Sequence, residues 1–361
     1  MRCVSVRTVG MLFLAGVMVC RAAGAAAPDP APTEAEFISA LDGSTQRYME
    51  ILPSDFKAES PHDVMIALHG HGSDRKQFAT DKRDECAGAR AVAARHAMVF
   101  ISPDYRATTS WMGPAAEADM VQLIAVLRGK YAVRRIFIMG GSMGGTSTLI
   151  FTVLHPELVA GACALNPMAN MVEYEGFPSQ IAASYGGTKA QKPEVYRSRS
   201  AEFFPERFKG IPVAITVGGM DTIVPPASAT RLAAALQAQD PERTLFINRP
   251  ETKHLTNLDD TVAALEFVIA HAADVAPTAP RPAVALAFKN GQTVAFVGDS
   301  ITRDGFSTIS GYGQLVVRAL AANGIVITPI RAGNGGECST NMLARIDGII
   351  AKKPDWVSLS C

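Results

Sequence analysis

Short apolar runs alternate with helical stretches from residue 35 to residue 272, and this alternation limits the possible folds more than any other feature. The apolar runs are rich in β-branched residues and lie at 63–70, 97–103, 135–141, 158–167 and 211–219. Helical patterns lie between them, for example at 116–131 and 228–239. Runs that are apolar throughout indicate strands buried on both faces. The sequence therefore predicts a doubly wound, mostly parallel α/β sheet over residues 35–272.

Two predicted linkers and one insertion interrupt the alternation of strands and helices. Residues 168–204 are predicted to be an insertion over the upper edge of the sheet, while residues 28–34 and the proline-rich residues 273–285 are predicted linkers. Beyond the second linker the strand and helix patterns restart, so residues 286–361 are predicted to form a second α/β domain. Its last apolar run ends the sequence, and we therefore expect this domain to be truncated.

The first 27 residues have the features of an export signal. Two arginines precede an apolar run at 11–19, and small residues follow at 22–27. The apolar run is too short to cross a bilayer easily. A lipoprotein anchored through Cys20 is less favoured, because the bulky Val19 precedes that cysteine. We expect cleavage after residue 27, export to the periplasm or the medium, and no membrane attachment of the mature chain.

The charge balance limits the class of partner. Lysine plus arginine and aspartate plus glutamate each number 34, so the formal net charge is +0. Nucleic-acid binding needs a basic surface that this composition does not suggest, and we expect a small-molecule or polysaccharide substrate instead. Four cysteines follow the signal, at positions that fit no metal-ligand spacing: Cys86, Cys163, Cys338 and Cys361. The first two are predicted to be structural, and the sequence does not assign any pairing.

One pentapeptide points to a nucleophile. Gly140-Gly141-Ser142-Met143-Gly144 matches G-x-S-x-G directly after a predicted strand and before a predicted helix. Glycines on both sides allow a sharp turn that strains the serine backbone and lifts its hydroxyl above the sheet. The N-terminus of the following helix stabilises negative charge at the same place. The motif therefore predicts that Ser142 is a nucleophile, and a glycine-rich connecting turn is the alternative.

The nucleophile needs a histidine to take its proton and a carboxylate to orient that histidine. Asp221 follows the apolar run at 211–219, and His254 lies in a loop after the next apolar run. The only other histidine after Asp221 is His271, which lies in or at the end of a predicted helix. We therefore predict Ser142, Asp221 and His254 as the catalytic residues.

A loop with two histidines follows the first apolar run. We expect the backbone N–H of His71 in this loop to pair with that of Met143 and bind an oxyanion. His69 and His71 also suggest a metal, but two histidines without a further ligand nearby make a weak site. We therefore expect neither a metal nor another cofactor.

These motifs give the first domain a family resemblance. Residues 35–272 resemble an α/β-hydrolase of the esterase branch, similar to the secreted acetyl xylan and feruloyl esterases and to the esterase D group. The resemblance rests on H-G-H-G, G-G-S-M-G-G, G-M-D-x-x-V-P and a late K-H, in the family's order. It implies a nucleophile, an acid, a base and two oxyanion N–H groups at Ser142, Asp221, His254, Met143 and His71.

The second domain resembles the SGNH, or GDSL-like, esterases, which implies a flavodoxin-like α/β fold. Gly298-Asp299-Ser300 follows a predicted strand and matches the block in which the family's serine attacks. Gly333-Asn334 resembles the second block, whose glycine donates an oxyanion N–H. The later blocks, which carry the base, do not occur in this sequence. Ser300 and Gly333 are therefore candidates for an incomplete second site.

The two resemblances together imply an exported serine carboxylic ester hydrolase. Two esterase-like modules favour a heavily esterified substrate, such as acetyl or feruloyl esters on plant-type polysaccharide, by analogy alone. A prolyl-oligopeptidase-like peptidase and a non-catalytic carbohydrate-binding or scaffold protein are the alternatives. Tyr105 and Trp111 lie in a loop after a predicted strand, and both are candidates to contact the substrate by stacking. The alternative for Trp111 is to pack beneath this loop.

Overall fold

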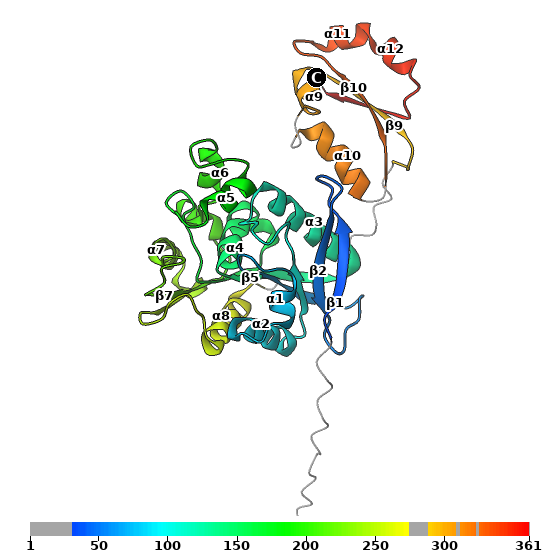
Figure 1. The fold of residues 1–361 in the computed structure, drawn as a ribbon. Helices are drawn as coiled ribbons and strands as arrows, with labels where there is room; N and C mark the ends of the chain where they lie inside the picture. The colour runs from blue at the N-terminus through cyan, green and yellow to red at the C-terminus, as the bar shows by residue number, and fades with distance from the viewer. Residues whose placement is uncertain (1–30, 274–287, 308–310, 323–324, 361) are drawn as a thin grey trace, which may run out of the picture.

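An eight-stranded sheet forms the centre of the larger unit (Figure 1). The computed structural model describes residues 31–273, 288–307, 311–322 and 325–360. The strands of the large sheet are β1 (Thr33–Ile38), β2 (Thr45–Ile51), β3 (His62–Leu68), β4 (Val99–Pro103), β5 (Val133–Gly141), β6 (Gly161–Leu165), β7 (Val213–Gly218) and β8 (Thr244–Arg249). Their spatial order is β1-β2-β4-β3-β5-β6-β7-β8. The pairs β1–β2 and β2–β4 are antiparallel and the other pairs are parallel, which confirms the predicted mostly parallel sheet.

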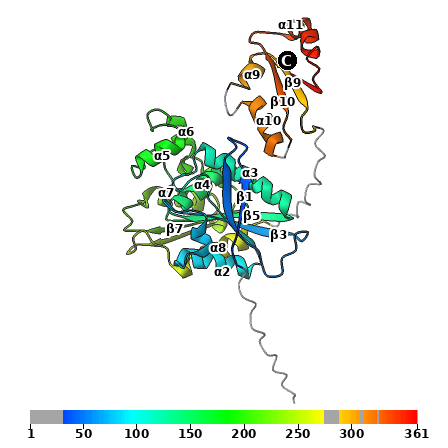
Figure 2. The ribbon, with the colours of Figure 1, turned by 45° about the vertical axis from the view of Figure 1, so that its right-hand side comes forward.

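Helices cover both faces of this sheet (Figure 2). They are α1 (Lys76–Thr80), α2 (Asp84–Arg95), α3 (Pro114–Lys130), α4 (Met143–Leu154), α7 (Ala227–Gln239) and α8 (Leu258–His271). Successive side chains of a strand point to opposite faces. In β3, Val64 and Ile66 pack in the core with α3 and α4, whereas Met65 and Ala67 pack in the core with α2 and α8. Burial on both faces explains why the strands read as continuous apolar runs.

The insertion predicted at 168–204 follows β6 and contains α5 (Pro178–Tyr185) and α6 (Pro193–Ser198). Its side chains Tyr174, Ile181 and Tyr185 are buried in the same core as α3. Four short 3-10 helices complete the described part of this unit: Pro156–Leu158, Ala201–Phe203, Pro205–Phe208 and Pro241–Arg243. The insertion is therefore a packed part of the unit.

The antiparallel edge of the sheet was not predicted. Thr33 and Glu34, which the sequence placed in a linker, are the first residues of β1. Every residue of β1 is at least partly exposed, so this edge strand has no apolar run by which it could be recognised. It is held by its antiparallel pairing with β2.

A second, three-stranded sheet is built from β9 (Thr293–Gly298), β10 (Thr328–Gly333) and β11 (Trp356–Ser360), in the order β10-β9-β11. Both of its pairings are parallel. The accompanying helices are α9 (Ser300–Asp304), α10 (Tyr312–Ala322), α11 (Ser339–Ala344) and α12 (Ile346–Ile350). The predicted export signal and most of the proline-rich linker lie outside the described residues. Within the described residues, no helix is both long enough and apolar enough to cross a membrane.

Candidate active site

Ser142 lies on the turn between β5 and α4 in a conformation that few residues with a side chain adopt. Its φ is 59° and its ψ is −121°, and such backbone strain is found preferentially at functional sites. Its N–H donates to the carbonyl oxygen of Leu165 at 2.8 Å. The turn is therefore tied to the carboxyl end of the neighbouring strand β6.

Two glycines make this turn sterically possible. A Cβ atom on Gly144 would lie 1.9 Å from the carbonyl oxygen of Leu68, and a Cβ on Gly140 would lie 2.5 Å from the backbone of Gly144. Both contacts are with backbone atoms, which cannot move aside as the end of a flexible side chain can. A Cβ on Gly141 would meet no atom within 4 Å. The close approach of β3, β5 and α4 therefore requires glycine at 140 and 144.

His254 and Asp221 lie in the loops that follow β8 and β7, and the structure joins them. The Nδ1 atom of His254 lies 2.5 Å from Oδ2 of Asp221. The other carboxylate oxygen of Asp221 accepts the N–H groups of Ile223 and Val224 at 2.8 and 3.0 Å, and the Asp221 side chain is only 2% exposed. The turn thus fixes the carboxylate, and the carboxylate fixes the imidazole ring. Because a carboxylate only accepts, Nδ1 carries the proton and Nε2 is free to take another.

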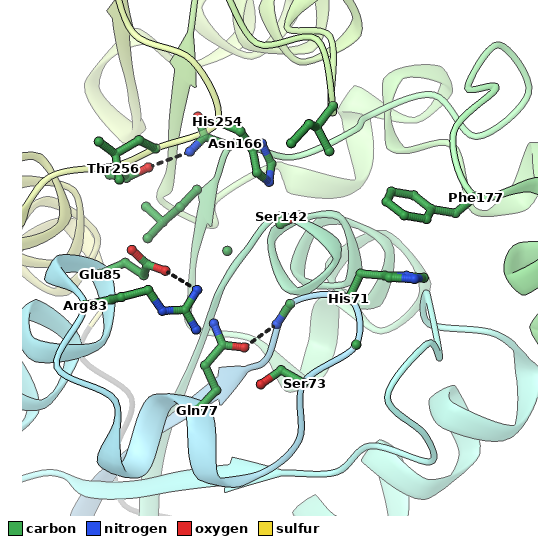
Figure 3. A pocket seen from close by; sticks show the side chains of 16 residues that line it. His71, Ser73, Gln77, Arg83, Glu85, Ser142, Asn166, Phe177, His254 and Thr256 are labelled. Atoms are coloured by element: carbon green, nitrogen blue, oxygen red, sulfur yellow. Dashed lines mark hydrogen bonds and ion pairs between the residues drawn. The ribbon is translucent and has the colours of Figure 1, made fainter.

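Ser142 and His254 line one cavity of about 410 Å³ (Figure 3). Asp221 does not line this cavity and contacts His254 from behind. The structure thus places Ser142 and His254 in one cavity and bonds His254 to Asp221. Such an arrangement supports attack by Ser142 on a carbonyl carbon, with His254 carrying the proton.

The predicted oxyanion donors are the backbone N–H groups of His71 and Met143. Neither N–H has a hydrogen-bond partner among the described residues. His71 lines the cavity, and Met143 is the first residue of α4, where the helix dipole favours negative charge. The His71 ring accepts a hydrogen bond from Nε1 of Trp111 at 3.0 Å and stacks on Phe177. Burial lowers the pKa of His71, so its ring is neutral at pH 7.

The structure corrects the substrate-contact role considered for Tyr105 and Trp111. Trp111 is 0% exposed and Tyr105 is 3% exposed, so neither ring can stack on a substrate. The Tyr105 hydroxyl donates to the carbonyl oxygen of His69 at 2.6 Å, and Trp111 bonds His71. Both rings therefore pack against the loop that contains His69 and His71, and the burial of Trp111 agrees with the packing alternative.

A polar residue that the sequence analysis missed connects the acid and base loops. Asn166, at a φ of 47° just after β6, donates from Nδ2 to the Thr256 hydroxyl at 2.9 Å. Its Oδ1 accepts the N–H of Gly218 at 3.1 Å. Thr256 lies two residues after His254, and Gly218 lies three residues before Asp221. Asn166 thereby fixes the position of one loop relative to the other, and its place at a strand end was the only sequence signal.

The remaining cavity wall is polar at one end and apolar at the other. In Figure 3, Gln77, Arg83 and Glu85 lie on one side of Ser142, and His71 and Phe177 lie on the other. None of the polar three belongs to a motif. They come from α1 and from the N-terminal end of α2. The sequence in this region predicts helices and gives no sign of a site.

Side chains that could hold a metal do not gather at this site. Within the described residues, no group of three or more His, Cys, Asp or Glu side chains is close enough to hold a metal ion. Both ring nitrogens of His69 already lie near backbone carbonyl oxygens, those of Gly70 at 2.8 Å and Asp104 at 3.2 Å. Burial lowers the pKa of His69. Cys86 and Cys163 are buried and Cys338 is exposed, and none of the three forms a disulfide within the part of the chain that the structure describes.

Ser300 and Gly333 belong to the smaller unit, Ser300 in α9 and Gly333 in β10. Ser300 is the first residue of α9, where the Asp299 side chain caps the helix by accepting the N–H of Ile301 at 2.9 Å. Gly333 ends β10 so close to α9 that a Cβ on it would lie 2.2 Å from the backbone nitrogen of Arg303. The structure thus brings the serine and the glycine to one helix. Residues 286–361 contain no histidine that could act as a base.

Comparisons with known proteins agree on the fold of the larger unit. Residues 105–275 match the prolyl oligopeptidase family, and no match was found among curated protein sequences. A Bacteroides ovatus protein assigned as a dipeptidyl aminopeptidase IV is similar at 18% identity and a TM-score of 0.54, over 67% of this chain but only 35% of that chain. The serine hydrolase FphF from Staphylococcus aureus is similar at 16% identity and a TM-score of 0.51, over 67% of this chain and 97% of that chain.

A ferulic acid esterase is similar at 17% identity and a TM-score of 0.50, again over 67% of this chain and 97% of that chain. Likeness at this identity concerns the fold, and residues of the large sheet have the α/β-hydrolase fold. Together with the match to a hydrolase family, and with a strained serine that shares a cavity with an aspartate-bonded histidine, this describes a serine hydrolase of the α/β-hydrolase type.

Proposed function

We propose that this serine hydrolase cleaves carboxylic esters through an acyl-enzyme. The observation that carries the proposal is the strained Ser142, which shares a cavity with a histidine whose other nitrogen is held by a buried carboxylate. Ser142 Oγ attacks the ester carbonyl carbon while His254 Nε2 takes its proton. Asp221 stabilises the imidazolium that forms and does not itself take the proton.

The negative charge then falls on the former carbonyl oxygen. The N–H groups of His71 and Met143 are the free donors beside the nucleophile, and we assign them to this oxyanion. His254 returns its proton to the departing alcohol, which leaves the acyl group on Ser142. A water molecule, deprotonated by His254, attacks the acyl-enzyme, and the acid and free serine are released.

The choice of ester over peptide is supported by a neighbour of matching length. The chain spans 97% of the ferulic acid esterase, but 35% of the aminopeptidase. The family match at 105–275 favours a peptidase of the prolyl oligopeptidase type as the second candidate. A non-catalytic carbohydrate-binding or scaffold role is disfavoured by the intact His254–Asp221 pair.

Further parts of the proposal rest on sequence patterns. The charged and apolar pattern of residues 1–27 supports export, and the blocks around Ser300 and Gly333 support an SGNH-type second domain. Together they favour acetyl or feruloyl esters on plant-type polysaccharide as substrates.

The test compares p-nitrophenyl acetate with peptide anilides on the purified protein. We expect a burst of p-nitrophenol, no cleavage of the anilides, and no effect of EDTA. The Ser142→Ala variant is the control, and it should show no burst. Cleavage of anilides but not of the ester would instead establish the peptidase.

A further inference from the structure

The polar end of the cavity contains an amide donor without a protein partner. Gln77 is 7% exposed and lines the cavity. Its Oε1 accepts the N–H of Gly70 at 2.8 Å, which turns Nε2 away from that bond, and Nε2 has no hydrogen-bond partner among the described residues (Figure 3). An oxygen atom of a molecule bound in the cavity can accept a hydrogen bond from Nε2.

Arg83 lines the same end and is held in place. Both its backbone N–H and its Nε donate to the Asp81 carboxylate, at 2.9 and 2.8 Å, and Glu85 lies 3.5 Å from its guanidinium. The two guanidinium ends of Arg90 donate to the carbonyl oxygens of Phe78 and Asp81, each at 2.7 Å. The turn between α1 and α2 is therefore rigid, which reduces the entropy lost when a ligand binds.

The charge at this end is not positive overall. The backbone N–H of Arg83 and the guanidinium hold the pKa of Asp81 below its ordinary value, so that carboxylate is charged at pH 7. The two carboxylates of Asp81 and Glu85 more than offset the single positive charge of Arg83. An anionic ligand would find no excess positive charge here and would meet the Glu85 carboxylate.

We propose that Gln77, Arg83 and Glu85 form a subsite for a neutral, hydroxyl-bearing part of the ester, such as a sugar ring or another polyol. A hydroxyl group donates and accepts at once, and this subsite offers amide and guanidinium donors beside a carboxylate acceptor. The apolar end near Phe177 is left for the carbon-rich part of the substrate. The proposal rests on the proposed esterase function, since it concerns the same cavity.

Three acetates of similar shape test the chemistry of this subsite. They are methyl 6-O-acetyl-glucoside, cyclohexylmethyl acetate, and the acetate of 4-(hydroxymethyl)cyclohexanecarboxylic acid. Each has a six-membered ring beside a primary acetate, and the rings are hydroxylated, apolar and anionic respectively. Values of kcat/KM are measured by titration of the released acid. We expect the glucoside to be preferred over the apolar ester by about tenfold or more, as hydrogen bonds to charged groups allow.

Two variants test which side chains cause the preference for the glucoside over the apolar ester. Arg83→Met should bring the ratio of kcat/KM for the glucoside to kcat/KM for cyclohexylmethyl acetate close to one. Gln77→Glu keeps the acceptor for Gly70 but loses the Nε2 donor, and it should lower the glucoside-to-apolar ratio. Arg95→Met is the matched control, because Arg95 is an exposed arginine of the same helix that pairs with Glu266; it should change nothing.

The outcomes separate this proposal from the esterase proposal. If no acetate is cleaved in a Ser142-dependent manner, the esterase function itself is wrong. If the apolar ester is cleaved as well as the glucoside, or if the preference survives Arg83→Met, the subsite is wrong. A preference for the anionic ester would show that Arg83 binds carboxylates and would overturn the choice of a neutral ligand.

Discussion

Ser142 and Ser300 occupy similar places in two different sheets. Each follows a parallel strand, β5 or β9, and stands at the start of a helix, α4 or α9. Ser142 has a φ of 59° and no side-chain cap, whereas Ser300 has no positive φ and follows Asp299, which caps α9. Only the first serine is therefore held on a strained turn.

The larger difference lies in what surrounds the two serines. His254 and Asp221 reach the first site from the loops after β8 and β7, which end at the same edge of the sheet as β5. Residues 286–361 contain no histidine. A serine motif thus supplies a nucleophile, but the later strands of the sheet supply the base that activates it.

The most direct test of the difference between Ser142 and Ser300 is to remove each hydroxyl group. Ser142→Ala should lower kcat for p-nitrophenyl acetate by about 10⁴-fold or more, and Ser300→Ala should leave it unchanged. Labelling with a fluorophosphonate, followed by peptide mapping, should find the label on Ser142 alone. Stoichiometric label on Ser300 would show that it has a base after all.

A matched pair of glycine substitutions tests the turn. Gly144→Ala places a Cβ 1.9 Å from the Leu68 carbonyl oxygen, whereas Gly141→Ala places one in open space. We expect Gly144→Ala to lose about 1–3 kcal/mol of unfolding free energy and, because Ser142 shifts, about a hundredfold in kcat/KM. Gly141→Ala should cost no more than about 0.5 kcal/mol. Equal thermal denaturation midpoints for the two variants would contradict a sterically required glycine.

The link between the acid and base loops gives a smaller effect. Asn166→Ala removes the bonds to Thr256 and Gly218, and we expect kcat to fall about ten- to a hundredfold because the His254 loop is displaced. Asn170→Ala is the control: Asn170 is equally buried and bonds Glu202 and nearby backbone, but it does not line the cavity. It should lose stability without losing kcat. A similar loss of kcat in both variants would reduce Asn166 to a structural role.

The sequence predicted the parts of this site that follow from local chemistry. A strained serine needs neighbouring glycines, and an acid and a base at strand ends need turns after apolar runs. Ser142, Asp221 and His254 could therefore be chosen from a motif, from their order and places after apolar runs, and from the scarcity of later histidines. The structure places Ser142 and His254 in one cavity and bonds His254 to Asp221. The buried strands were equally predictable, because burial on both faces leaves a continuous apolar run.

The rest depended on contacts between distant segments. Asn166 and Gln77 are ordinary polar residues in the sequence, and only their partners at Thr256 and Gly70 reveal what they do. Trp111 could equally have faced the substrate or the core, and its burial depends on the insertion that packs over it, through contacts such as Tyr174. Tertiary packing of this kind leaves no periodic signal in one sequence.

The pH dependence of stability offers a finer test of the surroundings of His71. Burial lowers the pKa of His71 from its ordinary value of 6.5. Below pH 6.5 the unfolded chain therefore binds a proton that the folded chain does not, and stability falls as the pH falls through this window. His71→Asn should flatten that fall by no more than about 1.4 kcal/mol per pH unit, while the similar contribution of His69 remains. Urea denaturation from pH 5.5 to 7.5 measures how the unfolding free energy changes with pH. Identical slopes for the wild type and His71→Asn would contradict the lowered pKa of His71.

The smallest effect should follow from removing the second region altogether. Among the described residues, the buried clusters of the large sheet contain none beyond 272, and those of the small sheet contain none before 288. Ser142, Asp221, His254 and the residues that line the cavity all precede residue 273. Deletion of residues 275–361 should therefore leave kcat/KM for p-nitrophenyl acetate within about twofold, since distant and separately packed sites act independently. A loss of soluble, active protein on this deletion would show that the first sheet depends on the second, and the two serines would then no longer be comparable as independent sites.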